Sequence, residues 1–159
     1  MRSHLVWAVV TVAMASACAQ RMTREAGGDV AMDSRSTPGA WDSELKGMNG
    51  WERIRGSAFA LPKDNGTRVA VTVERGFPGS NYGWDVREGT CAAPGRVVGA
   101  TAGYPTLFIG EDERDAKVAD VDVRLEPGKP YIINIYSMPV ERTTTIACGA
   151  LTPAVSDSD

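Results

Sequence analysis

The chain has 159 residues, 17 of them basic and 20 acidic, and a formal net charge of −3. It contains no lysine- or arginine-rich run, which excludes the electrostatic footprint of a nucleic-acid-binding protein. Its single histidine, His4, lies in a segment that we expect to be removed. The mature chain would then have no histidine-dependent zinc or copper site and no Ser-His or Cys-His nucleophile.

Residues 1–17 have the three parts of a secretory signal peptide. Arg2 supplies the positive charge, residues 5–14 form an apolar stretch, and Ala15-Ser16-Ala17 provide the small residues of a cleavage site. An apolar stretch of about ten residues is too short to span a bilayer, which takes roughly twenty. We therefore predict that the protein is exported to the cell envelope.

Cys18 directly follows these small residues. The pattern resembles the lipobox of bacterial lipoproteins, although Ala15 stands where that motif usually has leucine. A lipidated Cys18 would anchor the protein to a membrane surface, facing the periplasm or the outside. The alternative is ordinary cleavage after Ala17 or Ala19, which would leave a soluble periplasmic or secreted protein.

Composition divides the rest of the chain into three parts. Residues 18–40 are polar and rich in Gly, Ser, Thr and charge, so they are interpreted as the lipidated cysteine followed by a flexible tether. A tether of this length has a typical reach of about 25 Å. Residues 41–151 form one domain, and residues 152–159 are predicted to be a disordered tail.

The domain is predicted to be all-β, with residues 42–48 offering its only helix, a short one. Residues 54–61 and 68–74 flank Asn65-Gly66, the strongest short hairpin signal. Further strands are expected where apolar residues alternate with polar ones or form short runs, at residues 120–125, 131–137 and 143–148. Short strands separated by turns indicate a β-sandwich or Greek-key barrel.

Two local patterns between these strands allow alternative interpretations. Asn65-Gly66-Thr67 matches a glycosylation acceptor, although it also serves as a plain turn. A cluster of carboxylates suits either a weak calcium site or a solvated acidic loop. The members of the cluster are Glu111, Asp112, Glu113 and Asp115.

Four aromatic residues are candidates for a ligand-binding face, with core packing as the alternative. They are Trp41, Trp51, Tyr82 and Trp84.

Cys91 and Cys148 remain as an even pair once Cys18 is assigned to the signal. Because an exported protein enters an oxidising compartment, we expect these two to form a disulfide. The alternative is a pair of buried free thiols.

Three segments together resemble the Cu/Zn superoxide dismutase family and its shorter exported bacterial relatives. They read Gly-Trp-Asp-Val-Arg-Glu-Gly-Thr-Cys at 83–91, Tyr-Ile-Ile-Asn-Ile-Tyr at 131–136, and Ile-Ala-Cys-Gly-Ala-Leu at 146–151. In that family a Gly-aromatic-His-Val-His strand precedes the first disulfide cysteine, a later strand ends in His, and an Ala-Cys-Gly segment carries the second cysteine. The resemblance covers residues 56–151 and implies a Greek-key β-sandwich of the Cu/Zn superoxide dismutase type.

The resemblance also implies that the metal site has been lost. The copper-ligand positions correspond to Asp85, Arg87 and Tyr136, and residues 92–103 contain no counterpart of the zinc-binding histidines. The arginine that attracts superoxide in the family corresponds to Thr145. We therefore expect no cofactor, with an unknown metal ion as the alternative.

Arg87 offers a replacement for the lost cation. Two residues at i and i+2 share one face of a strand, so the Arg87 guanidinium could pair with Asp85 and with the Tyr136 hydroxyl. The alternative is that all three are ordinary residues of an exposed sheet face.

The favoured function is therefore a metal-free, non-catalytic binding or structural module of the cell envelope. Its partners would be the membrane, through the lipid anchor, and an unidentified envelope protein or ligand. The alternatives are an oxidoreductase of the same family with a divergent metal site and calcium-assisted adhesion through the acidic loop.

Overall fold

A computed structural model describes residues 37–138 and 144–154. The expected signal peptide, Cys18 and most of the tether lie outside the described residues, as do residues 139–143 and 155–159. Within the described ranges, no helix is both long and apolar enough to cross a membrane.

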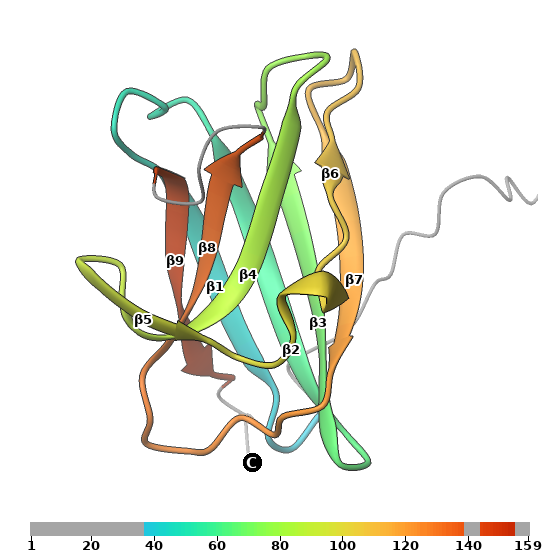
Figure 1. The fold of residues 1–159 in the computed structure, drawn as a ribbon, viewed down its shortest axis with the longest axis vertical. Helices are drawn as coiled ribbons and strands as arrows, with labels where there is room; N and C mark the ends of the chain where they lie inside the picture. The colour runs from blue at the N-terminus through green and yellow to red at the C-terminus, as the bar shows by residue number, and fades with distance from the viewer. Residues whose placement is uncertain (1–36, 139–143, 155–159) are drawn as a thin grey trace, which may run out of the picture.

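The described chain is all-β, as predicted, and forms one curled antiparallel sheet (Figure 1). Its strands are β1 (Trp41–Gly47), β2 (Arg55–Lys63), β3 (Gly66–Glu74), β4 (Asn81–Thr90), β5 (Ala93–Val97), β6 (Leu107–Phe108), β7 (Asp115–Val121), β8 (Tyr131–Ser137) and β9 (Thr145–Pro153). The strand order is β5-β4-β8-β9-β1-β2-β3-β7, and β6 pairs with β4. Neighbours such as β3 with β7, and β4 with β8, are therefore far apart in sequence.

The concave side of the curled sheet carries the hydrophobic core. Alternate residues of each strand point inward, so that Val69, Val71 and Val73 of β3 face Trp84 and Ile133 from the opposite side. All five are at most 1% exposed. Because side chains alternate with a period of two, the residues between these point to the outer face of the sheet.

The helix expected at residues 42–48 is wrong, because this segment is strand β1. Trp41, Ser43 and Leu45 are buried while the residues between them are not, which is a strand period. Residues such as Glu44 and Lys46 favour helices in isolation, but pairing with β2 and β9 overrides that preference.

The largest other differences from the predicted strand boundaries are near residue 120 and at the end of the domain. The strand expected at residues 120–125 lies instead at β7, and residues 122–130 form a loop. Strand β9 runs to Pro153, two residues beyond the expected end of the domain, because Trp41 and Asp42 of β1 pair with its last two residues.

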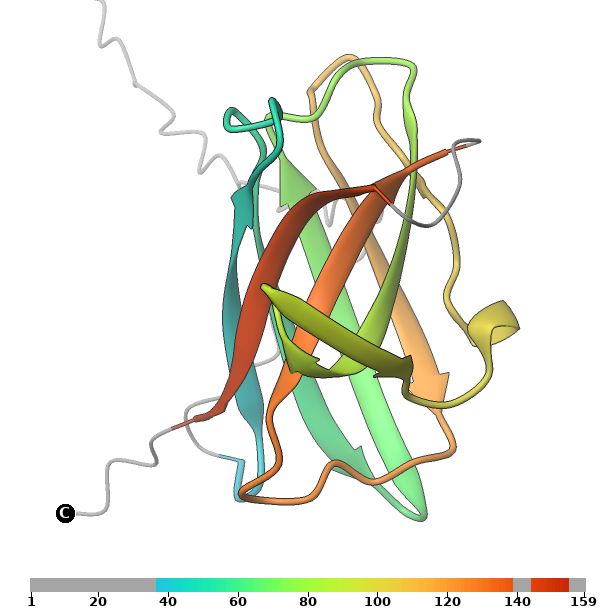
Figure 2. The same cartoon turned by 60° about the vertical axis from the view of Figure 1, so that its left-hand side comes forward.

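The hairpin formed by β4 and β5 folds across the outside of β8 and β9 (Figure 2). Cys91 lies at the turn of this hairpin and is bonded to Cys148 of β9, with 5.9 Å between their Cα atoms. The predicted disulfide is therefore confirmed. It holds the hairpin over an outward-facing part of the sheet, where Ile132 and Asn134 are nevertheless buried.

Candidate functional site

The candidate site is the part of the outer sheet face that lies beneath the β4–β5 hairpin. Its centre is Asp85 of β4, which has no exposed surface although it faces away from the hydrophobic core. Asp85 pairs in register with Asn134 of β8. The neighbouring residues Trp84 and Val86 point inward, so strand alternation fixes the outward direction of the carboxylate.

Arg87 supplies the partner of this buried carboxylate. Its Nε donates to Oδ1 of Asp85 at 2.8 Å, and its second terminal nitrogen donates to Oδ2 at 2.9 Å. A parallel pair of bonds of this kind is the strong form of an arginine–carboxylate interaction. The Arg87 side chain is 19% exposed, so the pair is largely shielded from water.

The structure also places Tyr136 near Asp85, on the same face of the sheet. Tyr136 of β8 pairs in register with Gly83, two residues before Asp85 and on the same face. A Cβ atom at Gly83 would lie 2.1 Å from Cε2 of Tyr136, so the ring occupies the space that a side chain there would need. Tyr136 is buried, with 4% of its surface exposed. These residues are therefore not members of an exposed sheet face.

The hairpin is tied to the site by polar contacts as well as by the disulfide. The remaining terminal nitrogen of Arg87 donates to the carbonyl oxygen of Gly95 on β5, at 3.4 Å. Arg96 and Glu88 form a second two-bond pair across the hairpin, at 2.7 and 2.8 Å. Arg87 thus joins the buried carboxylate to the backbone of the segment that covers it.

The electrostatics of the site follow from this pairing. The hydrogen bonds from Arg87 to Asp85 raise the pKa of the guanidinium above its ordinary value, burial opposes the shift, and the charge of Asp85 and the nearby Tyr136 hydroxyl add to it. Both oxygens of Asp85 are occupied by a permanent cation. A metal ion would have to displace that cation before it could bind the carboxylate.

Sequence reasoning missed two members of the site. Asn134 is 2% exposed, and its Oδ1 accepts a hydrogen bond of 2.7 Å from Oγ1 of Thr145. Thr145 was identified only as the position of a missing arginine, and Asn134 was not singled out. The sequence feature that could have indicated Asn134 is its position as a polar residue between Ile133 and Ile135.

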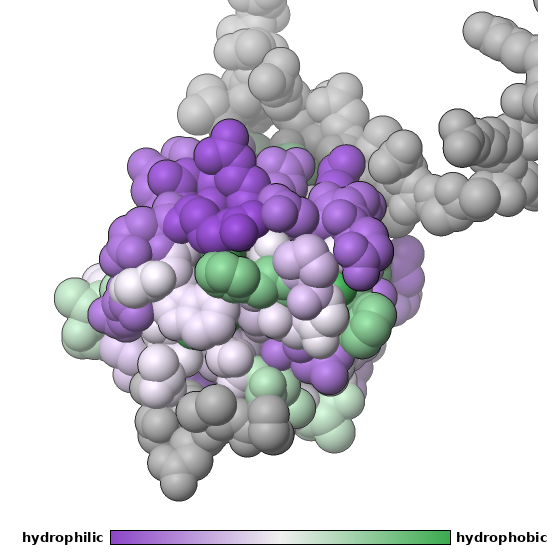
Figure 3. Space-filling view, turned by 90° about the horizontal axis from the view of Figure 1, so that it is seen from above, coloured by the Kyte–Doolittle hydropathy of each residue, from purple (hydrophilic) through white to green (hydrophobic). Residues whose placement is uncertain are grey.

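The four aromatic candidates do not form one shared ligand-binding face. Trp41, Tyr82 and Trp84 are buried in the core. Figure 3 views the domain from above, where a strongly hydrophilic area borders a paler area with some apolar side chains. Trp51 is half-buried in the loop that joins β1 to β2. There its ring meets Phe77 edge to face, with 5.2 Å between the ring centres.

The acidic loop already uses two of its carboxylates internally. Asp115 accepts from the backbone N–H of Phe108 at 2.7 Å, and Glu113 pairs with Arg53 at 2.7 Å. In the ranges 37–138 and 144–154, no three His, Cys, Asp or Glu side chains are grouped to hold a metal ion. The carboxylates of Asp115 and Glu113 would have to leave these contacts before they could bind calcium.

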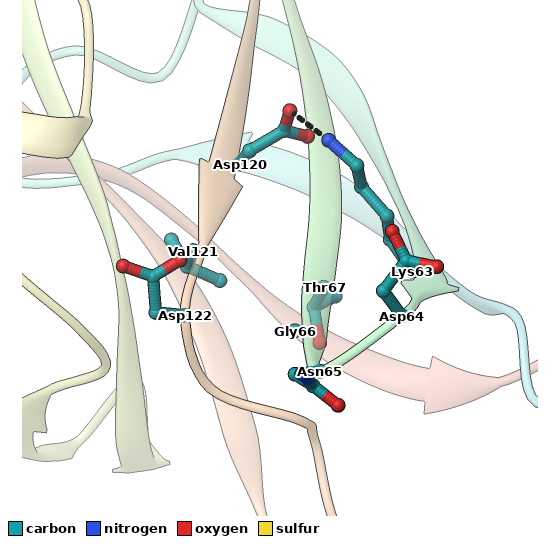
Figure 4. A pocket seen from close by; sticks show the side chains of 8 residues that line it. All are labelled: Lys63, Asp64, Asn65, Gly66, Thr67, Asp120, Val121 and Asp122. Carbon is teal, nitrogen blue, oxygen red and sulfur yellow. Dashed lines mark hydrogen bonds and ion pairs between the residues drawn. The ribbon is translucent and has the colours of Figure 1, made fainter.

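A separate pocket of about 430 Å³ lies between the β2–β3 turn and the end of β7 (Figure 4). The expected hairpin is present, but Lys63 pairs with Gly66, so Asp64 and Asn65 occupy its turn. Thr67, the last residue of the glycosylation pattern, is buried, and its hydroxyl donates to the carbonyl oxygen of Val123 at 2.8 Å. This favours the plain turn.

The carboxylates of Asp64 and Asp122 in this pocket point in different directions (Figure 4). The third carboxylate, that of Asp120, is held by Lys63 at 2.6 Å and by Arg68 at 2.7 and 2.9 Å. The pocket therefore offers a solvated surface rather than a converging set of ligands.

No family model matches the chain. No curated protein matches it either.

Proposed function

We propose that the protein is an exported, lipid-anchored, metal-free β-sandwich of the Cu/Zn superoxide dismutase type, acting as a non-catalytic binding or structural module of the cell envelope. The observation that carries this proposal is the buried pair of Asp85 and Arg87. Where the family resemblance implies two copper ligands, this chain has a carboxylate neutralised by a guanidinium. A site completed by its own cation serves stability rather than redox chemistry.

The topology supports the resemblance. The first three strands lie in sequence order, while β7 returns over a long connection to pair with β3 and β9 returns to pair with β1, and such long returns support the proposed Greek-key type. The positions of the expected copper ligands also lie on one outward face, covered by a segment that is disulfide-bonded to the last strand. Fold alone does not assign a function, so the chemistry of the site decides between a module and an enzyme.

Metal analysis and a superoxide dismutation assay test the proposal together. We expect protein purified from the periplasm to contain no stoichiometric metal and to lack activity. Stoichiometric copper or manganese with activity would overturn the proposal and establish the alternative, an oxidoreductase with a divergent metal site. Stoichiometric calcium would instead favour adhesion through the acidic loop.

Restoring imidazoles tests the mapping of the site. Because Asp85, Arg87 and Tyr136 stand at the expected copper positions, replacing all three with histidine should create measurable copper affinity. The matched control places histidines at Glu44, Lys46 and Ser57, which lie on the outer face of other strands. A folded triple variant that binds copper no better than this control would show that the mapping is wrong.

The anchor has its own test. The mass of the N-terminal peptide from native protein should equal that of a triacylated peptide starting at Cys18. An unmodified peptide that starts at Cys18 or Gln20 would instead show a soluble protein cut by ordinary signal peptidase.

A further inference from the structure

An apolar groove of about 260 Å³ lies at the end of the domain where β1 begins and β9 ends. Trp41 and Leu125, each 5% exposed, line it together with three prolines that are largely exposed. The prolines are Pro62, Pro127 and Pro153. Arg124 is the charged residue in the lining, so the groove combines an apolar surface with one positive charge.

We propose that residues 29–33 of the same chain, Asp-Val-Ala-Met-Asp, bind in this groove. Val30, Ala31 and Met32 are the longest apolar run between the signal peptide and the domain, and an aspartate stands on each side of them. The apolar side chains would cover Trp41 and Leu125, and the aspartates would meet the guanidinium of Arg124. The segment therefore matches the groove in both polarity and charge.

The segment lies only a few residues before the edge of the groove along the chain. Residues 37–40 form a turn in which the N–H of Ala40 donates to the carbonyl oxygen of Thr37 at 3.1 Å, with Gly39 at a φ of 76°. Proline followed by glycine with positive φ suits a type II turn, which reverses the chain at the edge of the groove. Asp33 is four residues before Thr37, within about 14 Å of it even when the chain is extended.

Arg124 is available for this contact. One of its terminal nitrogens donates to the backbone oxygen of Asp64, which orients the side chain without neutralising its charge. A guanidinium has five N–H donors, so most of them remain for a carboxylate. The other neighbouring segment, residues 155–159, has only one large apolar residue, Val155, and matches the groove less well.

Docking would shorten the tether. If residues 29–33 are bound, the free tether from Cys18 is about eleven residues, with a typical reach of about 18 Å instead of about 25 Å. This consequence rests on the lipid anchor of the proposed function, whereas the docking itself does not. The test below measures the docking alone.

Amide hydrogen exchange of the full chain, expressed with its own signal, tests the proposal. In the double variant Val30→Ser/Met32→Ser, we expect amides of residues 122–130 to exchange about tenfold faster, because the cover of the loop is lost. The matched control, Met22→Ser/Ala26→Ser, removes apolar side chains from the tether outside the segment and should leave these rates unchanged. Peptides from β3 should exchange equally in all variants, which separates local opening from global unfolding.

Reversing the charges of the contact provides a second test of the docking. Arg124→Glu should accelerate exchange in the same loop, and adding Asp29→Lys/Asp33→Lys should restore much of the protection. Equal rates in wild type and Val30→Ser/Met32→Ser would overturn the proposal. So would loss of protection in Val155→Ser alone, which would identify the tail as the occupant, or protection that increases with protein concentration, which would identify a second copy.

Discussion

Arg87 and Asp85 form a two-bond ion pair within one strand, and the carboxylate of that pair has no exposed surface. The pair lies outside the hydrophobic core, yet the disulfide-bonded hairpin excludes water from the carboxylate. A charge in such a place depends on its partner, because an unpaired buried ion has a large desolvation cost. This relationship connects the stability of the domain to the residues that stand at the expected metal positions.

Arg87→Ala should therefore destabilise the domain strongly. Removing the guanidinium leaves the Asp85 carboxylate buried without a cation, and we expect a loss of about 3 kcal/mol in the free energy of unfolding. Urea unfolding at pH 7 measures it. The matched control is Arg96→Ala, which breaks a similar two-bond pair with Glu88, but Arg96 is 77% exposed, so its loss should be much smaller. Equal small losses in both variants would show that burial of Asp85 has no energetic role.

Gly83→Ala should destabilise the domain through the ring of Tyr136. The added Cβ would lie 2.1 Å from Cε2 of a buried tyrosine, so the ring or the strand has to shift, with an expected loss of about 1–3 kcal/mol. The double variant Gly83→Ala/Tyr136→Ala should lose clearly less than the sum of the two single changes. Gly103→Ala is the control, because a Cβ there meets no atom within 4 Å. Additive losses would contradict the packing of Tyr136 on Gly83.

The sequence predicted the all-β class because strand alternation and turn residues are local signals, and it predicted the disulfide because Cys91 and Cys148 remain as an even pair. Alternation of valines in β3 and the Asn65-Gly66 dipeptide mark a hairpin without knowledge of the rest of the chain, although Asp64 and Asn65 are the residues that occupy its turn. Strand β1 was missed because its sequence suits a helix, and only its two partner strands make it extended. Such tertiary effects cannot be read from a window of seven residues.

The candidate site was predicted in part. The i, i+2 spacing of Asp85 and Arg87 places them on one strand face whatever the fold, so their pairing follows from periodicity. Their burial does not, because it depends on the β4–β5 hairpin folding over β8 and β9. Asn134 was missed for the same reason. Its side chain points to the outer face of the sheet, and it is buried because the hairpin covers that face.

Replacing both disulfide cysteines with serine should destabilise the domain without changing its topology. Cys91 and Cys148 are 57 residues apart, and the chain-entropy model gives about 4 kcal/mol for closing a loop of this length. Urea unfolding of the double serine variant measures the loss. Amides of residues 91–97 should also exchange faster than those of β3, because the hairpin keeps only its polar contacts. A loss below about 1 kcal/mol would mean that the unfolded chain is compact without the bond.

Asp120 should make stability depend on pH in the acid range. Hydrogen bonds from Arg68 and then Lys63 hold the pKa of Asp120 well below its ordinary value, so the folded state favours the ionised carboxylate. A group with a lowered folded pKa stabilises the protein above its unfolded pKa, near 4, and this contribution is lost as the pH falls further. Wild type should therefore exceed Asp120→Asn at pH 7, by under about 1 kcal/mol because the ion pair is exposed to solvent. Urea unfolding should show that the difference in unfolding free energy between wild type and Asp120→Asn shrinks steadily between pH 4 and pH 2. A difference that stays constant over this range would show that the two cations do not stabilise the carboxylate.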